Sequence, residues 1–159
     1  GTWSVLVALK SAGEDMGAPY VRRAVEWLKA CQNPEGGWGE SCDTYNDPAL
    51  AGKGASTPSQ TSWALLGLMA AGEVNSPEVE RGVRYLLKRQ NAKGGWDERL
   101  FTGTGFPRVF YLRYHGYSQY FPLWALGVYG RLRAGGRTRQ DEASLTGTAG
   151  LKLPAVKEK

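Results

Sequence analysis

Aromatic side chains crowd one stretch of this sequence. Residues 101–129 hold ten of its eighteen aromatic residues, including all four phenylalanines. The face of an aromatic ring is electron-rich and attracts a nearby cation without bonding to it. Several such rings around a water-free cavity could therefore stabilise a carbocation during a reaction. The same crowding is also typical of an ordinary hydrophobic core, so the residue types alone leave both interpretations open.

The backbone that positions these rings could take two forms. A helix would place every third or fourth aromatic residue on one face, whereas an extended segment would place Phe110, Leu112 and Tyr114 on one side. Glycine and proline residues interrupt this part of the chain and disfavour a long helix. We expect extended or irregular backbone to about Tyr117. A helix should then begin near Pro122, because proline suits the first position of a helix.

A repeat organises the rest of the chain. The segment Arg23–Gly39 matches Arg81–Asp97 at one constant spacing. The segment Thr2–Gly13 likewise matches Thr61–Gly72, and a third, partial copy begins at Trp124. Self-similarity of this kind is the signature of an architecture built from stacked structural units.

Each copy predicts two helices. The first is apolar almost all round, over Trp3–Ala12 and again over Thr61–Ala71, and we expect it to be buried on every side. The second is amphipathic, over Tyr20–Gln32 and Ser76–Gln90. Alternating buried and half-exposed helices favour an all-α fold, a sector of an α/α toroid. A closed barrel would need more copies, so we expect the chain to be part of a longer protein.

Few residues offer acid, nucleophilic or metal chemistry. Cys31 and Cys42 are the only cysteines and His115 is the only histidine, which argues against a structural zinc site. Asp43 and Asp47 lie in a predicted loop, where hydrogen-bonding or solvated carboxylates are the usual finding. The acidic pairs Glu14–Asp15 and Asp97–Glu98 follow glycine-containing turns, and we expect them to be turn or cap residues. We therefore nominate no catalytic residue in this sequence.

The positive charge is concentrated at one end. The net charge is +5, of which residues 131–159 carry +4. These residues are rich in Gly, Thr and Ala, and we expect 134–159 to form a disordered basic tail after a folded region at 1–133. A nucleic-acid-binding protein would carry its basic surface on the folded region, so we expect no nucleic-acid partner.

The repeat unit resembles the QW motif of the triterpene cyclases. Gln32 with Trp38, and Gln90 with Trp96, occupy the positions that name the motif. In addition, the segment 103–127, which reads GTGFPRVFYLRYHGYSQYFPLWALG, is very similar to the C-terminal signature of bacterial squalene–hopene cyclases. The resemblance covers about residues 1–133.

The resemblance implies roles for particular residues. The two Gln–Trp pairs would be structural braces between successive helices. Five residues would line the substrate cavity and face the cations of the reaction: Phe106, Phe110, Leu112, Tyr114 and Tyr117. The reaction would be the proton-initiated cyclisation of squalene to hopene or hopanol, an isomerase or lyase reaction without cofactor or metal.

The family's acid is an Asp-x-Asp-Asp motif, which this sequence lacks, so an isolated fragment should be inactive. The resemblance also implies attachment to one side of the membrane, facing the cytoplasm, as a peripheral or monotopic protein. It further implies a polyprenoid ligand and a homodimer.

Three other interpretations stay open. An oxidosqualene cyclase or another triterpene cyclase would share most of these motifs. A protein prenyltransferase β-subunit has the same toroid, but it needs zinc ligands that are scarce here. A non-catalytic helical-repeat scaffold would also fit the sequence.

Overall fold

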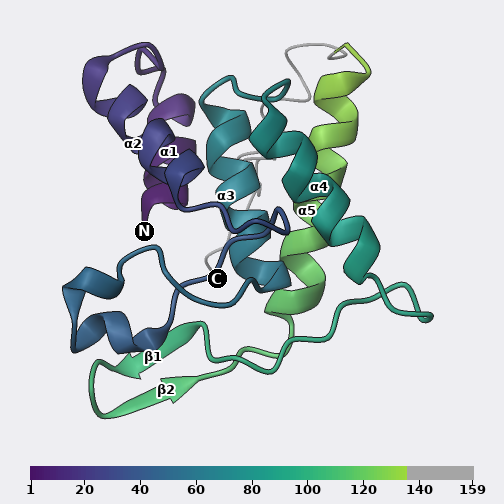
Figure 1. The fold of residues 1–159 in the computed structure, drawn as a ribbon. Helices are drawn as coiled ribbons and strands as arrows, with labels where there is room; N and C mark the ends of the chain where they lie inside the picture. The colour runs from purple at the N-terminus through teal and green to yellow at the C-terminus, as the bar shows by residue number, and fades with distance from the viewer. Residues whose placement is uncertain (136–159) are drawn as a thin grey trace, which may run out of the picture.

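The computed structural model describes residues 1–135 (Figure 1). These residues form five α-helices, two short 3₁₀ helices and one two-stranded sheet. In chain order they are α1 (Thr2–Ser11), α2 (Pro19–Ala30), η1 (Cys42–Tyr45), η2 (Pro48–Leu50), α3 (Pro58–Ala70), α4 (Pro77–Arg89), β1 (Gly103–Phe106), β2 (Phe110–Leu112) and α5 (Tyr117–Arg133). The prediction of an all-α fold is confirmed, with a small hairpin added to it.

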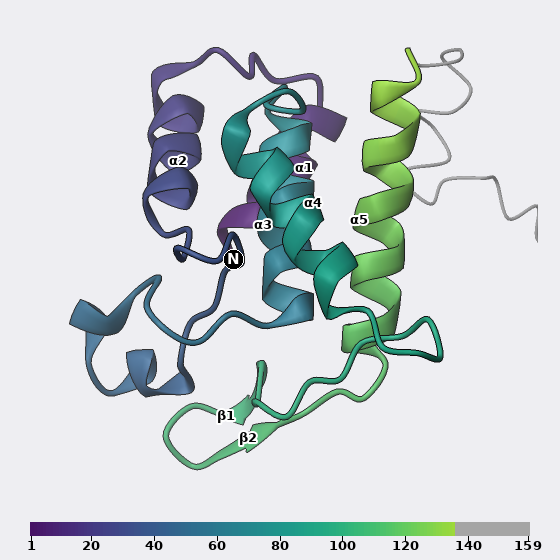
Figure 2. The same ribbon diagram turned by 45° about the vertical axis from the view of Figure 1, so that its right-hand side comes forward.

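The helices form two layers. Helices α1, α3 and α5 make an inner row with α3 in the middle, and α2 and α4 lie on one side of this row (Figures 1 and 2). Helix α3 is buried on nearly every side because it packs against α1, α5 and α4 at once. At Gly67, a Cβ atom would lie 2.9 Å from the Cα atom of Trp3, so this glycine permits the close approach of α1.

The prediction that both apolar helices are buried all round holds for α3 and is wrong for α1. Within the described residues, α1 buries only Leu6 fully, and Val5 is exposed. The physical reason is position in the row, since α1 contacts α2 and α3 over only part of its surface. The periodicity of a helix therefore reports its apolar character but not the number of its neighbours.

The helix ends follow the local sequence as expected. Helix α4 begins at Pro77, and the Ser76 hydroxyl accepts a hydrogen bond from the backbone N–H of Val79. Glycines with positive φ follow the ends of all three inner helices: Gly13 (83°), Gly72 (86°) and Gly135 (83°). A residue with a Cβ would be strained there, so the Ala-Gly signal ends each inner helix.

Helix α5 begins earlier than predicted. It begins at Tyr117, so Pro122 lies inside the helix, where it is fully buried. Pro122 has no backbone N–H, so the carbonyl of Ser118 receives no helical hydrogen bond from it. The extended backbone before Tyr117 is confirmed as β1 and β2. Of the predicted basic tail at 134–159, all but Ala134 and Gly135 lies outside the described residues.

Candidate functional site

The first part of the signature forms a hairpin of β1 and β2 beneath the inner helices, and the rest begins α5 (Figure 2). Strands β1 and β2 pair antiparallel, with Gly103 opposite Leu112 and Thr104 opposite Tyr111. A Cβ at Gly105 would overlap the ring of Phe110, and a Cβ at Gly103 would overlap the ring of Tyr114. The two glycines therefore leave room for these rings to lie over the backbone of β1.

The structure divides the five predicted cavity residues into two groups. Phe106 and Phe110 meet edge to face, with ring centroids 5.6 Å apart, and are 64% and 45% exposed. Leu112 lies on the same side of β2 as Phe110 and is also exposed. These three side chains form an open apolar surface on the hairpin.

Tyr114 and Tyr117 form the second group, which packs against aromatic residues of the inner helices. Their rings stack with centroids 4.7 Å apart. Tyr117 also meets the edges of Trp63 and Phe121, at 5.9 and 5.1 Å. The two stacked tyrosines thus connect the chain just after β2 to the inner row of helices.

Sequence reasoning missed the aromatic cluster that receives these tyrosines. Trp3 of α1 stacks on Trp63 of α3 at 6.0 Å and contacts the edges of Phe121 and Trp124 of α5. The available signal was the repeat itself, because Trp63 and Trp124 begin matching segments of the inner helices. A repeat shows which residues occupy equivalent positions in successive helices, but it does not show which of their rings will be in contact in the folded protein.

A cleft of about 390 Å³ lies beside this cluster. Trp3, Trp27 and Trp63 line it together with both cysteines. Burial, with a smaller contribution from Glu40, raises the pKa of the Cys31 thiol, and burial likewise raises that of Cys42, so both thiols stay protonated at neutral pH. A protonated thiol is a weak nucleophile, so neither cysteine is suited to attack a cation.

The loop carboxylates act as local hydrogen-bond acceptors. Asp43 accepts from the Ser41 hydroxyl at 2.8 Å, and Asp47 accepts from the backbone N–H of Ala49 at 2.9 Å. Glu98 reaches further, accepting from both the backbone N–H and the hydroxyl of Ser59 at the start of α3, at 2.9 and 2.7 Å. These contacts match the hydrogen-bonding role expected for carboxylates in turns.

His115 is exposed. Within residues 1–135, no three His, Cys, Asp or Glu side chains come together in a way that could hold a metal ion. None of the helices in the same range is long and apolar enough to cross a bilayer.

The predicted Gln–Trp pairs make the same contacts in both units. The indole N–H of Trp38 donates to the carbonyl of Leu28 at 2.7 Å, and that of Trp96 donates to Leu86 at 2.8 Å. Gln32 and Gln90 each donate to the carbonyl of the glycine four residues later, Gly36 and Gly94.

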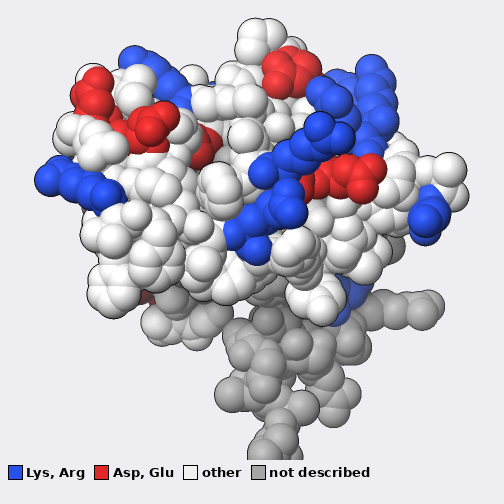
Figure 3. Space-filling view, turned by 90° about the horizontal axis from the view of Figure 1, so that it is seen from below, with Lys and Arg blue, Asp and Glu red and all other residues white. Residues whose placement is uncertain are grey.

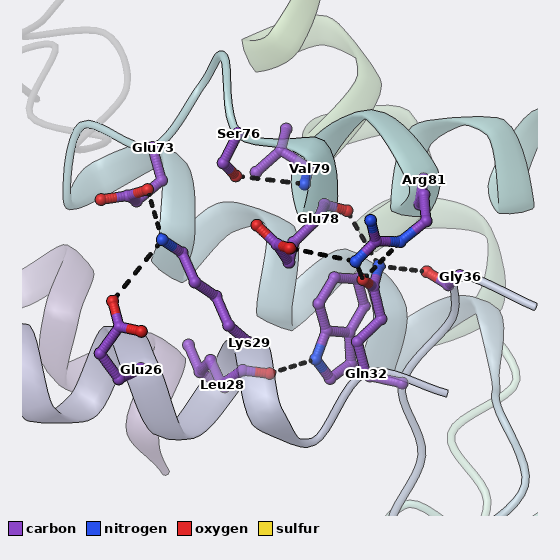
Figure 4. A network of polar contacts seen from close by, with 11 residues as sticks. Glu26, Leu28, Lys29, Gln32, Gly36, Glu73, Ser76, Glu78, Val79 and Arg81 are labelled. Atoms are coloured by element: carbon purple, nitrogen blue, oxygen red, sulfur yellow. Dashed lines mark hydrogen bonds and ion pairs between the residues drawn. The ribbon is translucent and has the colours of Figure 1, made fainter. Parts of the chain in front are cut away.

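Gln32 also joins two helices, because it donates to the carbonyl of Glu78 and accepts from Arg81 of α4 (Figure 4). The contacts fit a bracing role for both pairs, which stays a prediction.

A second polar network links α2 to the turn before α4. The ammonium of Lys29 lies 2.8 Å from Glu73 and 3.6 Å from Glu26 (Figure 4). Burial opposes ionisation of the Glu73 carboxyl, but hydrogen bonds and charge from Lys29 and Arg22 outweigh it, so its pKa is lowered.

Seen from below, Lys and Arg side chains run in a band with carboxylates beside it, and a broad uncharged area adjoins them (Figure 3).

The sequence of this chain is similar to those of known cyclases. The family model for the squalene-hopene cyclase C-terminal domain matches residues 1–131. The squalene–hopene cyclase of Bradyrhizobium diazoefficiens is 59% identical over 134 residues, which cover 84% of this chain and 20% of that protein.

A probable squalene–hopene cyclase of Sinorhizobium fredii is 59% identical over 135 residues, covering 84% of this chain and 21% of that protein. A dammaradiene synthase of Dryopteris crassirhizoma is 48% identical over 143 residues, covering 81% of this chain and 21% of that protein. The chain thus spans about a fifth of the length of these relatives. The match over nearly all the described residues shows that the chain belongs to the squalene–hopene cyclase C-terminal domain family.

Proposed function

We propose that this chain forms one wall of the substrate cavity in a squalene–hopene-type cyclase. The reaction is the protonation of squalene and its closure into hopene or hopanol, an isomerase or lyase reaction. The observation that carries the proposal is the placement of two sets of aromatic rings: Phe106 with Phe110 on the hairpin, and Tyr114 with Tyr117 against Trp63 of the inner row. The names of the bacterial relatives, which are squalene–hopene cyclases, support the choice of substrate.

The role of the wall is to stabilise positive charge without reacting. Each ring face stabilises an adjacent cation by about 0.5–2 kcal/mol, so several rings in series can direct successive ring closures. In this proposal Phe106 and Phe110 face the later cations, Leu112 shapes the folded substrate, and Tyr114 and Tyr117 line the region of the first rings. Asp43, Asp47 and Glu98 are committed to turns and a helix end. Because the sequence lacks the family's Asp-x-Asp-Asp motif, we assign the acid that protonates squalene to another segment.

The membrane is the expected source of the substrate, because squalene is a hydrocarbon. We propose that the protein acts at the cytoplasmic side of a membrane as a peripheral or monotopic homodimer. The uncharged area in Figure 3 and the exposed apolar side chains of Leu100 and Phe101 are compatible with a lipid-facing surface.

A chimeric enzyme tests the proposal. The matching stretch of the Bradyrhizobium cyclase would be replaced by this chain, and the chimera would be offered squalene and, separately, oxidosqualene. Gas chromatography of the lipid extract should detect hopene or hopanol from squalene. The chain alone should give no product. A folded, membrane-associated chimera that makes no triterpene from squalene would overturn the assignment.

Two substitutions then test the residue roles. Phe110→Ala and Tyr114→Ala should both shift the product mixture toward incompletely closed rings, because each removes one cation-stabilising face. Tyr129→Ala is a matched control, since Tyr129 is a half-buried aromatic residue of α5 outside the proposed wall. An unchanged product mixture in both wall variants would leave plain packing as their role.

A further inference from the structure

The hairpin depends on a neighbour to fix its orientation. A two-stranded hairpin is marginally stable by itself in water. Here the side chains of Phe106, Val109 and Phe110 are exposed, so they contribute little to holding it in place. The Tyr114–Tyr117 stack holds its base against α5, and a second contact lies on the other side of the hairpin.

That neighbour is the loop that contains η1. Tyr45 at the end of η1 stacks on Tyr111 of β2, with ring centroids 6.1 Å apart and planes at 29°. The guanidinium Nε of Arg108 donates to the carbonyl of Tyr45 at 2.7 Å. The thiol of Cys42 donates to the carbonyl of Phe101 at 3.6 Å, just before β1. Three contacts thus join η1 to both ends of the hairpin.

Because of the strand geometry, the docking of Tyr111 on η1 also sets the direction in which Phe110 and Leu112 point. Successive side chains of a strand point to opposite sides, so the face that carries Tyr111 is opposite the face that carries Phe110 and Leu112. When Tyr111 is held against Tyr45, the other two side chains must face away from η1. The turn is held as well, because the backbone N–H of Arg108 donates to the Tyr111 hydroxyl at 3.2 Å.

Arg108 lies in the turn of the hairpin and takes part in this docking. Its φ is +66°, which makes it the one non-glycine residue with positive φ among residues 1–135. Arg108 follows Pro107 in the turn that the Val109 N–H closes onto the Phe106 carbonyl at 3.0 Å, and a turn of this kind requires positive φ at its third residue. From this position its backbone N–H reaches the Tyr111 hydroxyl and its side chain reaches the Tyr45 carbonyl.

The η1 loop is in turn fixed to the inner row. The side-chain amide of Gln60 in α3 pairs with both backbone groups of Glu40, accepting from its N–H and donating to its carbonyl at 3.0 Å each. The Glu40 carboxylate accepts from the backbone N–H of Gly52. The backbone N–H of Ser41 donates to the carbonyl of Lys53 at 3.1 Å, which closes the loop. A continuous set of contacts therefore runs from α3 through η1 to the hairpin.

We infer that Tyr45 is a positioning residue that sets the orientation of Phe110 and Leu112 and thereby the product specificity of the cyclase. This inference rests on the proposed function for its consequence, but the docking of η1 on the hairpin can be tested without activity. Tyr45 acts through Tyr111 and needs no contact with substrate.

Thiol labelling tests the docking in this chain. With Cys31→Ala, Cys42 is the only thiol, and its hydrogen bond lies in the η1–hairpin contact. Tyr45→Ala should speed labelling of Cys42 by an aromatic disulfide reagent by about two- to tenfold, the range expected for loss of one aromatic pair. Tyr45→Phe, which keeps the ring, should label at the original rate.

The matched control is Tyr20→Ala. Tyr20 is 45% exposed and Tyr45 is 43% exposed, but Tyr20 bonds to Glu14 far from the hairpin. Arg108→Gly provides a second variant in case Tyr45→Ala does not fold, because glycine accepts the positive φ and removes only the contact to Tyr45. Arg108→Gly should likewise increase the rate at which Cys42 is labelled. Labelling rates equal to the control in the folded variants would overturn the inference.

The same substitutions in the chimera test the consequence for specificity. Tyr45→Ala should raise the fraction of incompletely cyclised triterpenes at least about twofold over Tyr20→Ala, with Tyr45→Phe close to the parent. Faster labelling with an unchanged product mixture would refute the role in specificity. A parent chimera without any product would instead refute the proposed function, and the labelling rates would still decide whether Tyr45 positions the hairpin.

Discussion

In each repeat unit, one indole closes the glycine turn onto the helix before it. Trp38 and Trp96 are both buried, and each donates to a carbonyl in the last turns of its own helix. The indole combines a large apolar surface with one hydrogen-bond donor that needs a partner when buried. These two properties contribute to stability separately, so they can be separated by substitution.

Replacing Trp96 should show both contributions. Trp96→Phe keeps most of the apolar contact and removes the donor, so the free energy of unfolding should fall by about 0.5–1.5 kcal/mol. Trp96→Ala should lower it by about 3–5 kcal/mol. Urea unfolding followed by circular dichroism measures both. Trp27→Phe, at a 41% exposed tryptophan, is the control and should change stability by less than about 0.5 kcal/mol.

Glu73 makes stability depend on pH. Its pKa is lowered in the folded state, so its contribution is present above the ordinary pKa of a glutamate and is lost as pH falls through the lowered value. At neutral pH, Glu73→Gln should lower the free energy of unfolding by about 1 kcal/mol. The two proteins should converge in acid. Urea unfolding over a pH series checks this, and a constant difference at all pH values would contradict it.

For single residues, the sequence predicted the structure where a residue type strongly prefers one local conformation or contact. The Ala-Gly helix ends and the Ser76 cap could be read directly from it. The stacking of Tyr45 on Tyr111 could not, because it joins residues far apart in the sequence through a loop without regular pattern. The roles of the five cavity residues stay predictions from resemblance.

Two glycines in the inner helices give opposite expectations at the scale of elements. Gly67 faces Trp3 of α1, where a Cβ would be 2.9 Å from a Cα atom, whereas Gly127 of α5 has open space around it. Gly127→Ala should raise the free energy of unfolding by about 0.5–1 kcal/mol, since alanine favours the helix. Gly67→Ala should lower it by about 1–3 kcal/mol through overpacking. Thermal and urea unfolding measure both, and an equal effect of the two would refute this account of α1–α3 packing.

Element types followed from the sequence more readily than element boundaries. The repeat gave the inner and outer helices because two copies supported each assignment. The predicted start of α5 near Pro122 is wrong because a proline that suits the first turn of a helix here lies inside it. The exposure of α1 was also misjudged, since local periodicity carries no information about how many helices surround it.

For the described region as a whole, we expect a single cooperative unfolding transition. Helix α3 packs against helices of both repeat units, and Trp3 contacts rings on both α3 and α5. Neither unit can therefore lose its structure without exposing the other. Tryptophan fluorescence and far-ultraviolet circular dichroism should give coincident urea transitions. Two separated transitions would show that the units unfold independently.

The bond from Glu98 to Ser59 has a consequence for recombination between relatives. The carboxylate that completes the start of α3 is encoded 39 residues after the serine that it contacts. A crossover placed at the apparent repeat boundary, after Gly72, would draw the two partners from different parents. A unit that keeps this pair together is therefore offset from the unit that repeats in sequence, because it ends only after Glu98.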